Sequence, residues 1–322
     1  MFLESRLMFI YVETPLHAGA GSGVGAIDLP IQREQTTSLP MVQAPGIKGA
    51  LRSEVRNAEK GQKNEPLLTA VFGANAGDDN LHAGAFSPGD ARLLLFPVRS
   101  LKGVFAWTTC LGVLHRWRRE AVAAGFAPET LPILPTVEPD ESACFTSGDG
   151  ATLSDGTVVL EEFAFKKAQT SIAHLASWLA LNALPQGDEY KWWREGLKAR
   201  LILLRDDDFR DFAQQATEVL TRIRLEPDTK TVASGALWTE EHLPPETLLY
   251  APARATRLRL NNGDKPADLK KSEPVAEAAA VLDWVSNAGN IPHRFQLGGD
   301  ETVGRGLVSL RWLKPADAQK VE

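Results

Sequence analysis

The chain has 322 residues, of which 43% are hydrophobic and 24% are charged, and its formal net charge is −6. These values are typical of a globular protein with a sizeable core and argue against one coated by nucleic acid on every side, although they leave room for a local basic groove. No stretch approaches the roughly 20 apolar residues of a membrane span, so no membrane partner is expected. The two cysteines, Cys110 and Cys144, lie far apart without a CxxC, which disfavours structural zinc and disulfides and favours a reducing cytoplasm.

The first half of the chain alternates between predicted strands and helices. Residues 7–14 are a predicted strand, a glycine-rich loop follows, and a helix is predicted to open at Gly46. Residues 92–98 are typical of a buried strand. A helix is predicted directly afterwards, because apolar residues recur there at helical spacing: Val104, Trp107, Leu111 and Leu114.

The second half continues this alternation. Residues 171–184, 208–225 and 274–288 are predicted helices, and a closing strand begins at Leu307. Residues 229–238 have strand composition on both sides of Ser234-Gly235, which predicts a hairpin turning there.

Two stretches rich in Pro, Asp and Gly, 74–90 and 138–156, are predicted to be mobile insertions. No repeat of 20–50 residues is visible. The sequence therefore predicts a mixed α+β fold with an interrupted, ferredoxin-like βαββαβ order.

The helix predicted from Gly46 carries a basic face. Lys48, Arg52 and Arg56 recur at i, i+4 and i+8, away from the apolar stripe. Such a face is either solvated or a rail for phosphates, and a lysine in the first helical turn favours the phosphate rail. Arg99 and Lys102, at a second strand-to-helix junction, are further candidates for contacts with backbone phosphates.

The segment "LGGDETVGRG" near the end of the chain is rich in glycine, but no helix follows it. A dinucleotide-binding or kinase loop is therefore disfavoured. A tight hairpin would explain some of the glycines, and close approach to another backbone, such as that of RNA, explains more of them. The candidate RNA-binding residues here are Gly298, Gly299, Thr302, Gly304 and Arg305.

The stretch "LHAGAGSGVGAIDLPIQRE" has a glycine at every second position from Gly19 to Gly25, and Asp28 is the only acid between Thr14 and Arg33. Together with "GIKGALR", "DARLLLFPVRSLKGVFAW" and "GGDETVGRG", it resembles the backbone subunits of type III-B CRISPR effector complexes, members of the RAMP superfamily. The motifs occur in family order, and the resemblance runs from Tyr11 to near Trp312. It implies a single RRM-like domain over residues 1–322 with a β-hairpin thumb, which we place at 224–249.

The resemblance also implies the partners and the activity. Family subunits stack head to tail along a guide RNA, together with other type III-B subunits, and cut a paired target RNA once per subunit at regular intervals. The acid of the family lies in the loop after the first strand, the position that Asp28 occupies. The glycines would make a mobile loop that lies against RNA, where Asp28 meets the scissile phosphate.

The chemistry needs few residues. In-line attack by a 2′-OH requires a proton acceptor and compensation of the phosphate charge, so Asp28 is expected either to accept the proton or to hold a weakly bound divalent ion such as Mg²⁺. His17 is a candidate proton donor or phosphate contact, or a structural histidine. Glu240 and Glu241 would orient the nucleotide or the metal, or form a solvated acidic pair.

Two other functions stay open at this point. The chain could be a non-catalytic structural RNA-binding subunit, in which Asp28 is only a loop acid. It could also be a stand-alone endoribonuclease that processes guide RNA, which would favour catalysis by histidine. The "GAIDLPIQRE" context favours the target-cutting subunit over both.

Overall fold

A computed structural model describes residues 1–23, 25–58, 65–75, 77 and 81–321; Val24 in the glycine-rich loop and part of the predicted insertion 74–90 lie outside the described residues. Its strands are β1 (Glu4–Val12), β2 (Met41–Val42), β3 (Phe86–Pro88), β4 (Ala91–Ser100), β5 (Val104–Cys110), β6 (Ala143–Thr146), β7 (Thr157–Leu160), β8 (Phe163–Ser171), β9 (Leu201–Leu204), β10 (Glu218–Leu225), β11 (Val232–His242), β12 (Leu248–Ala255), β13 (Arg294–Gln296) and β14 (Leu307–Leu313). Its α-helices are α1 (Ala44–Ala58), α2 (Glu65–Phe72), α3 (Leu111–Ala123), α4 (Ala173–Asn182), α5 (Lys191–Arg200), α6 (Asp206–Gln215) and α7 (Pro274–Val285).

A central sheet positions the rest of the fold. β14, β1, β12 and β4 lie side by side in that order, and each neighbouring pair is antiparallel. α1 stands between β1 and β4 in the chain, and α7 stands between β12 and β14. These elements follow the predicted βαββαβ order, with everything from β5 to β11 inserted between its second and third strands. The predicted mixed fold is confirmed.

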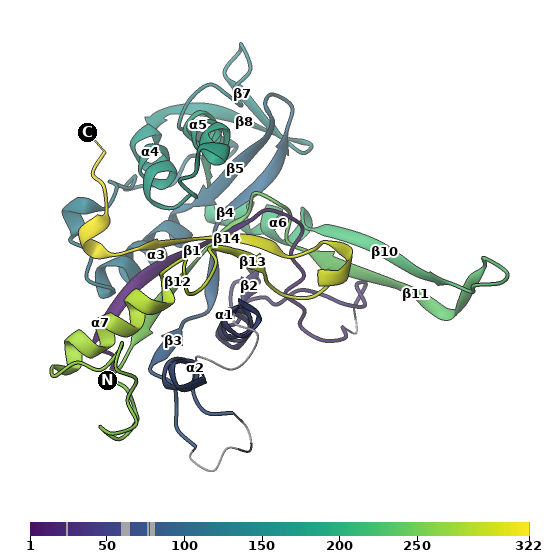
Figure 1. The fold of residues 1–322 in the computed structure, drawn as a ribbon. Helices are drawn as coiled ribbons and strands as arrows, with labels where there is room; N and C mark the ends of the chain where they lie inside the picture. Colours follow the sequence, from purple (N-terminus) through teal and green to yellow (C-terminus); the bar gives the residue numbers. More distant parts are fainter. Residues whose placement is uncertain (24, 59–64, 76, 78–80, 322) are drawn as a thin grey trace.

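β4 continues from this sheet into a barrel (Figure 1). Its second half pairs with β5, and the order goes on through β9, β6, β8 and β7. β7 returns to β4 where Ser100 pairs with Leu160, which closes the ring. The predicted insertion 138–156 supplies β6 to this barrel.

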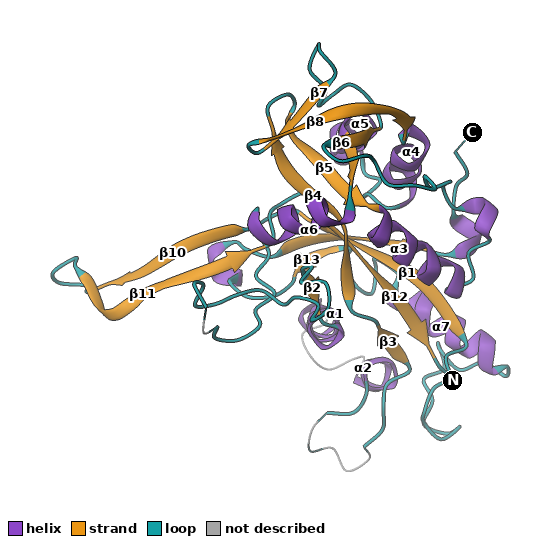
Figure 2. Ribbon diagram, turned by 180° about the vertical axis from the view of Figure 1, so that it is seen from behind, coloured by secondary structure: helices purple, strands orange, loops and turns teal. Residues whose placement is uncertain are grey.

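Helices cover the central sheet on both faces. α7 packs on β1 and β12, while α3 packs on β4, β5 and β12 from the other side (Figures 1 and 2). Residues 7–12 of β1 are consequently all buried, at 2% exposure or less. Burial of each large apolar side chain contributes about 1.5–3 kcal/mol to the stability of the folded state. β1 is therefore held rigidly in the sheet and fixes the start of the loop that follows it. None of the helices in the described part of the chain is long and apolar enough to cross a membrane.

β10 and β11 form a two-stranded ribbon that projects from the body of the protein (Figures 1 and 2). The ladder pairs Glu218 with His242 at the base and Leu225 with Val232 near the tip. The predicted turn at Ser234-Gly235 is wrong, because both residues lie within β11. Gly235 has a φ of +70° and lies in an irregular part of the ladder, which is why a glycine stands there.

Two helix predictions are also wrong in part. The segment 208–225 is not one helix, because α6 ends at Gln215 and β10 begins at Glu218. Val104 and Trp107 belong to β5, and the helix begins only at Leu111. β5 pairs with β4 on one side and β9 on the other and is buried from residue 106 onward, so it lacks the alternation that identifies a strand. The strands β1, β4 and β14 and the helices α1, α4 and α7 match their predictions.

Candidate active site and nucleic-acid interface

Four segments of the chain meet at the base of the β10–β11 ribbon. The chain leaving β1 pairs Leu16 with Leu243, and the glycine-rich loop pairs Leu29 with Glu240. The terminal glycine-rich segment joins them, because Gly299 N donates to His17 O at 2.9 Å. The structure therefore brings together the loop of Asp28, His17, both acids of β11 and the segment 297–306.

Asp28 is held by the ribbon. Its Oδ2 accepts hydrogen bonds from Thr239 N at 2.8 Å and Thr239 Oγ1 at 3.0 Å, and Asp28 N donates to Thr239 Oγ1 at 3.0 Å. These bonds favour the charged form and hold the pKa of the carboxyl below its ordinary value. Asp28 is exposed to solvent. The structure thus presents an ionised carboxylate in a fixed position at the foot of the ribbon.

The glycine-rich loop is folded onto itself. Ala20 N donates to Pro30 O at 2.9 Å, and Gly23 N donates to Asp28 O at 2.8 Å. A Cβ at Gly23 would lie 2.8 Å from Ile27 O, so only glycine fits this close approach. The glycines therefore shape a compact loop whose backbone fixes the residue at position 28.

His17 lies beside the base of the ribbon. Its Nδ1 is 2.7 Å from Glu241 O, and because a carbonyl only accepts, Nδ1 carries the proton. The basic nitrogen of the neutral ring is then Nε2. A Cβ at Gly19 would lie 2.7 Å from Nε2, and one at Gly298 would lie 2.4 Å from His17 O. Gly298 is therefore required for the close packing around this histidine, and Gly19 leaves room for its ring.

Glu241 is a buried structural acid. Its Oε1 accepts from Arg33 Nη2 at 2.5 Å and from Thr217 Oγ1 at 2.8 Å, and its Oε2 accepts from Ile31 N at 3.0 Å. Its exposure is 2%, and that of Glu240 is 4%. The interpretation of these two residues as a solvated acidic pair is wrong. The carboxylate of Glu241 instead anchors the end of the Asp28 loop to the ribbon.

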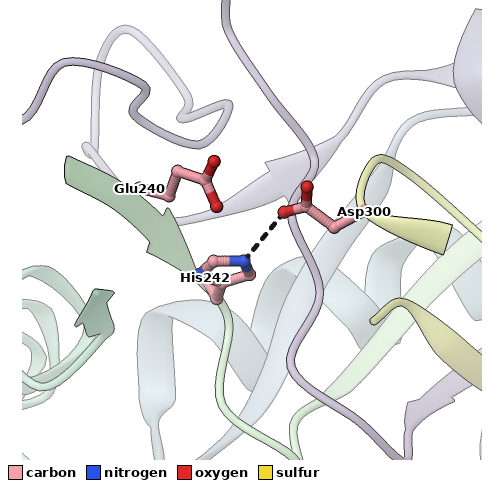
Figure 3. A group of neighbouring side chains, drawn as sticks. All are labelled: Glu240, His242 and Asp300. Atoms are coloured by element: carbon pink, nitrogen blue, oxygen red, sulfur yellow. Dashed lines mark hydrogen bonds and ion pairs between the residues drawn. The ribbon is translucent and has the colours of Figure 1, made fainter. Parts of the chain in front are cut away.

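Glu240 points to the opposite face of β11, where it meets His242 and Asp300 (Figure 3). One ligand atom from each of these residues lies within 4.8 Å of the others. His242 Nε2 is 3.2 Å from Asp300 Oδ2, and Trp238 Nε1 donates to Glu240 Oε1 at 2.6 Å. Arg222 approaches Glu240 Oε2 at 3.5 Å. Burial, more than any other influence, lowers the pKa of His242 and keeps its ring neutral.

The segment 297–306 curves around this cluster. Asp300 has a φ of +63°, and the short helix η3 (Glu301–Val303) follows it and ends at Gly304, whose φ is +77°. Thr302 and Gly304 are exposed, and Arg305 Nη1 lies 3.8 Å from Glu218 Oε2. The left-handed residues produce a tight loop whose outer side faces solvent.

The basic face of α1 is partly occupied by its own neighbours. Arg52 Nη2 donates to Gly73 O at 3.0 Å, and Arg56 donates to Asn75. Lys48 is half-buried, and its pKa is lowered first by burial and then by nearby arginines. The helix begins at Ala44, so Lys48 does not lie in the first turn, and that part of the argument for it is wrong.

Arg99 and Lys102 lie at the barrel instead. Arg99 Nε donates to Glu161 Oε2 at 2.9 Å, and Lys102 Nζ donates to Asp149 O at 2.9 Å and Thr152 O at 2.6 Å. In both ribbon views, the barrel and α1 lie on opposite sides of the base of the β10–β11 ribbon (Figures 1 and 2). The structure does not bring these two residues together with the basic residues of α1.

Sequence reasoning missed several residues of this region, namely Arg33, Thr217, Arg222, Thr239, His242 and Asp300. Alternation along β11 would have found two of them, because Thr239 shares a face with Glu241 and His242 shares the other face with Glu240. That signal was hidden because the turn was placed inside the strand.

The chain matches the family model of the RAMP superfamily over residues 9–309. It is 34% identical over 309 residues to the "CRISPR system Cmr endoribonuclease Cmr4" of Pyrococcus furiosus, which covers 96% of this chain and 95% of that protein. It is 25% identical to the "CRISPR system CMR subunit Cmr4" of Saccharolobus solfataricus, over 95% of each.

Solved structures agree with these sequence matches. The crystal structure of oligomeric Cmr4 from Pyrococcus furiosus superposes with a TM-score of 0.69 at 30% identity, covering 97% of this chain and 98% of that one. A chain of the type III-B Cmr-beta complex bound to cognate target RNA gives a TM-score of 0.68 over 99% of both chains, and at 21% identity it shows the fold alone. The family model and the relative from Pyrococcus furiosus both match nearly the whole length, and the chain belongs to the RAMP superfamily.

Proposed function

We propose that this chain is the guide-RNA-binding backbone subunit of a type III-B CRISPR effector and cleaves guide-complementary target RNA at one site per subunit. The observation that carries the proposal is the ionised, exposed carboxylate of Asp28, fixed by Thr239 at the foot of a projecting ribbon. The match to a relative named as an endoribonuclease supports the activity.

The hydrogen bonds of Asp28 favour one of its two possible roles. A carboxyl whose pKa is lowered is a weaker proton acceptor, because a general base works best when its pKa lies near the operating pH. The same charge is well suited to hold a divalent cation. Mg²⁺ retains several waters and needs few carboxylates when a phosphate supplies other ligands, so Asp28 alone fits a weakly bound Mg²⁺ that would offset phosphate charge.

His17 complements this carboxylate. Its Nδ1 proton is fixed on Glu241 O, so Nε2 can accept a proton from a nearby hydroxyl. Both residues are attached to β11, at Thr239 and Glu241, two residues and therefore about 7 Å apart along the strand. We assign proton transfer to His17 Nε2 and charge compensation to Asp28. Glu241, which is paired with Arg33, supports both residues: its carboxylate anchors the loop of Asp28 at Ile31 N, and its carbonyl orients the ring of His17.

The proposed partners follow from the same family. Copies of the chain would stack head to tail along the guide RNA, with other type III-B subunits at the ends, and the relative in a solved structure is described as oligomeric. A head-to-tail contact that does not close produces a row of subunits and repeats the site of Asp28 at a fixed interval. We place the complex in the cytoplasm, where Cys110 and Cys144, both buried free thiols, stay reduced.

The test of this function is cleavage by the reconstituted complex. The chain, assembled with the remaining type III-B subunits and a guide RNA of defined sequence, is given end-labelled target RNAs that match or do not match the guide. We expect a regular ladder of products with the matched target only. Binding without cleavage would identify a structural subunit, and cleavage of the guide precursor by the chain alone would identify a processing enzyme; either result contradicts the proposal.

Replacing Lys48 with alanine should weaken guide binding. The half-buried ammonium would meet a phosphate on the outer side of α1, so its loss should reduce the slope of log affinity against log salt by about 1. Filter binding at several salt concentrations measures the slope. Lys271→Ala, at an exposed lysine outside α1, is the control, and an equal slope in the two variants would place Lys48 away from RNA.

Shortening the ribbon should abolish the regular spacing of the cuts. Ile223 and Leu237 are directly paired, so residues 224–236 can be replaced by Asn-Gly, a two-residue turn suited to such a pair. The base of the ribbon from Glu218 to Ile223 keeps its partners, and we expect the chain to stay folded. Product lengths on a sequencing gel provide the measurement, with Thr229→Ala at the tip as the control. An unchanged ladder would mean that another element sets the spacing.

A further inference from the structure

The cluster of Glu240, His242 and Asp300 has the composition of a metal site distinct from that of Asp28. The three side chains come from β11 and from the segment 297–306, which are nearly 60 residues apart, His242 and Asp300 being separated by 58 positions (Figure 3). The alternation of side chains along β11 puts Glu240 and His242 on the face opposite Thr239, which holds Asp28.

Burial makes this cluster more than a group of surface acids. Glu240 is 4% exposed and His242 is fully buried. Within the described residues, Oε2 of Glu240 is buried and accepts no hydrogen bond. Figure 3 shows one oxygen of this carboxylate turned toward His242. A buried carboxylate oxygen without a donor is costly, and a cation removes that cost.

The charges around the cluster leave room for a cation. Among the described residues, one guanidinium forms ion pairs with Glu240 and Asp300, that of Arg222, which reaches them at 3.5 Å and 3.8 Å without a hydrogen bond to either. Arg305 lies 3.8 Å from a third acid, Glu218. Two carboxylates and an imidazole therefore share this one ion-pairing guanidinium.

The distances suit a transition metal. Zn²⁺ binds nitrogen and oxygen ligands at about 2.0–2.2 Å, which places neighbouring ligand atoms about 3.2–3.6 Å apart. The His242–Asp300 separation of 3.2 Å already meets this value, and no ligand atoms are more than 4.8 Å apart. An imidazole with two carboxylates and no thiolate suits Zn²⁺, Mn²⁺ or Co²⁺ better than Ca²⁺.

We propose that Glu240, His242 and Asp300 form a binding site for a divalent transition-metal ion of the Zn²⁺ class, which ties the base of the β10–β11 ribbon to the terminal glycine-rich segment. The ion replaces the hydrogen bond between His242 and Asp300 with a bond to each, and the ring proton of His242 moves from Nε2 to Nδ1. Its effect is structural, because it joins two segments that otherwise touch through weak ion pairs. This site does not depend on the proposed function, since it needs no RNA.

Metal binding to the full chain without RNA tests the proposal. Protein freed of metal with a chelator is titrated with Zn²⁺ by calorimetry and with Co²⁺ by visible spectroscopy. We expect one saturable site, a Co²⁺ spectrum of nitrogen and oxygen ligands without sulfur, and a rise of a few degrees in melting temperature. Absence of saturable binding up to millimolar metal would overturn the proposal.

Variants locate the site. His242→Gln and Asp300→Asn should each weaken Zn²⁺ binding by at least about tenfold. Asn tolerates the positive φ at position 300, so this second variant keeps the loop conformation. His174→Gln, at a surface histidine, and Asp28→Asn should leave the affinity unchanged. Binding that survives both ligand variants, or is lost with Asp28→Asn, would contradict the site, and circular dichroism of the metal-free variants checks that they are folded.

Discussion

Asp28→Asn should reduce cleavage of a matched target RNA by about 10²-fold or more while guide and target affinities change by less than a few-fold. The substitution preserves the shape and lets the amide oxygen accept from Thr239 N, but it removes the charge that would offset the phosphate or hold Mg²⁺. Single-turnover cleavage with saturating complex measures the chemical step apart from binding. Chelation of divalent ions should lower the wild-type rate in the same way.

Matched controls separate the charge from its position. Glu301→Gln removes an exposed acid from the neighbouring loop and should cut at the wild-type rate. Thr239→Val keeps the charge of Asp28 but removes two of its hydrogen bonds, and we expect a smaller loss than for Asp28→Asn. Because those bonds lower the pKa of Asp28, it stays ionised from about pH 5 to pH 8, so a change in rate across that range must come from another group. Wild-type cleavage by Asp28→Asn would identify the chain as a structural subunit.

Glu241→Gln should destabilise the protein by about 3 kcal/mol, within the range for removing one partner of a buried ion pair. The amide has a single acceptor oxygen, so its NH₂ group meets a donor whichever way it turns: either Arg33 and Thr217 or Ile31 N loses its acceptor on residue 241. Urea unfolding followed by circular dichroism measures the loss. The anchor of the Asp28 loop weakens at the same time, so we also expect slower cleavage.

A comparison variant shows whether the burial of Glu241 is responsible for the expected loss of stability. Glu226→Gln removes an acid from the exposed tip of the ribbon and should change the free energy of unfolding by less than about 0.5 kcal/mol. Equal stability of Glu241→Gln and wild type would mean that the contact between Arg33 and Glu241 adds nothing once its desolvation is included.

The central sheet and its helices were predictable because each element has one consistent pattern. β1 is a short, unbroken apolar run, as in a strand that is buried on both faces, and α7 is an apolar, alanine-rich run opened by Pro274. The ribbon was harder, since a projecting hairpin has little core against which side chains sort into buried and exposed. In β10 and in residues 232–237 of β11 exposed residues prevail, and Gly235 gave a turn signal inside a strand. The true turn follows Glu226 and contains Pro227-Asp228, which are typical turn residues.

The candidate site was likewise predictable only in part from the sequence. Asp28 and His17 stand out in the sequence because a glycine-rich stretch precedes the acid and the histidine follows soon after the first strand. Their partners cannot be predicted locally, since Thr239 lies 211 positions from Asp28 and Glu241 lies 224 positions from His17. Only the closed fold brings the ribbon beside the loop. The burial of Glu240 and Glu241 follows from that contact as well, and two adjacent acids in a sequence normally indicate a surface.

The closure of the barrel also limits how copies of this chain can aggregate. A ring of strands has no edge to which another strand could be added, and the outermost strand of the central sheet, β13, is only three residues long. The long unpaired edges in the described part of the chain are those of the β10–β11 ribbon, where Arg222 and Arg224 place charge along one strand. Charged edge residues oppose sheet extension. Rows of this protein should therefore grow by contact between side-chain surfaces, so they can come apart again without breaking a shared sheet.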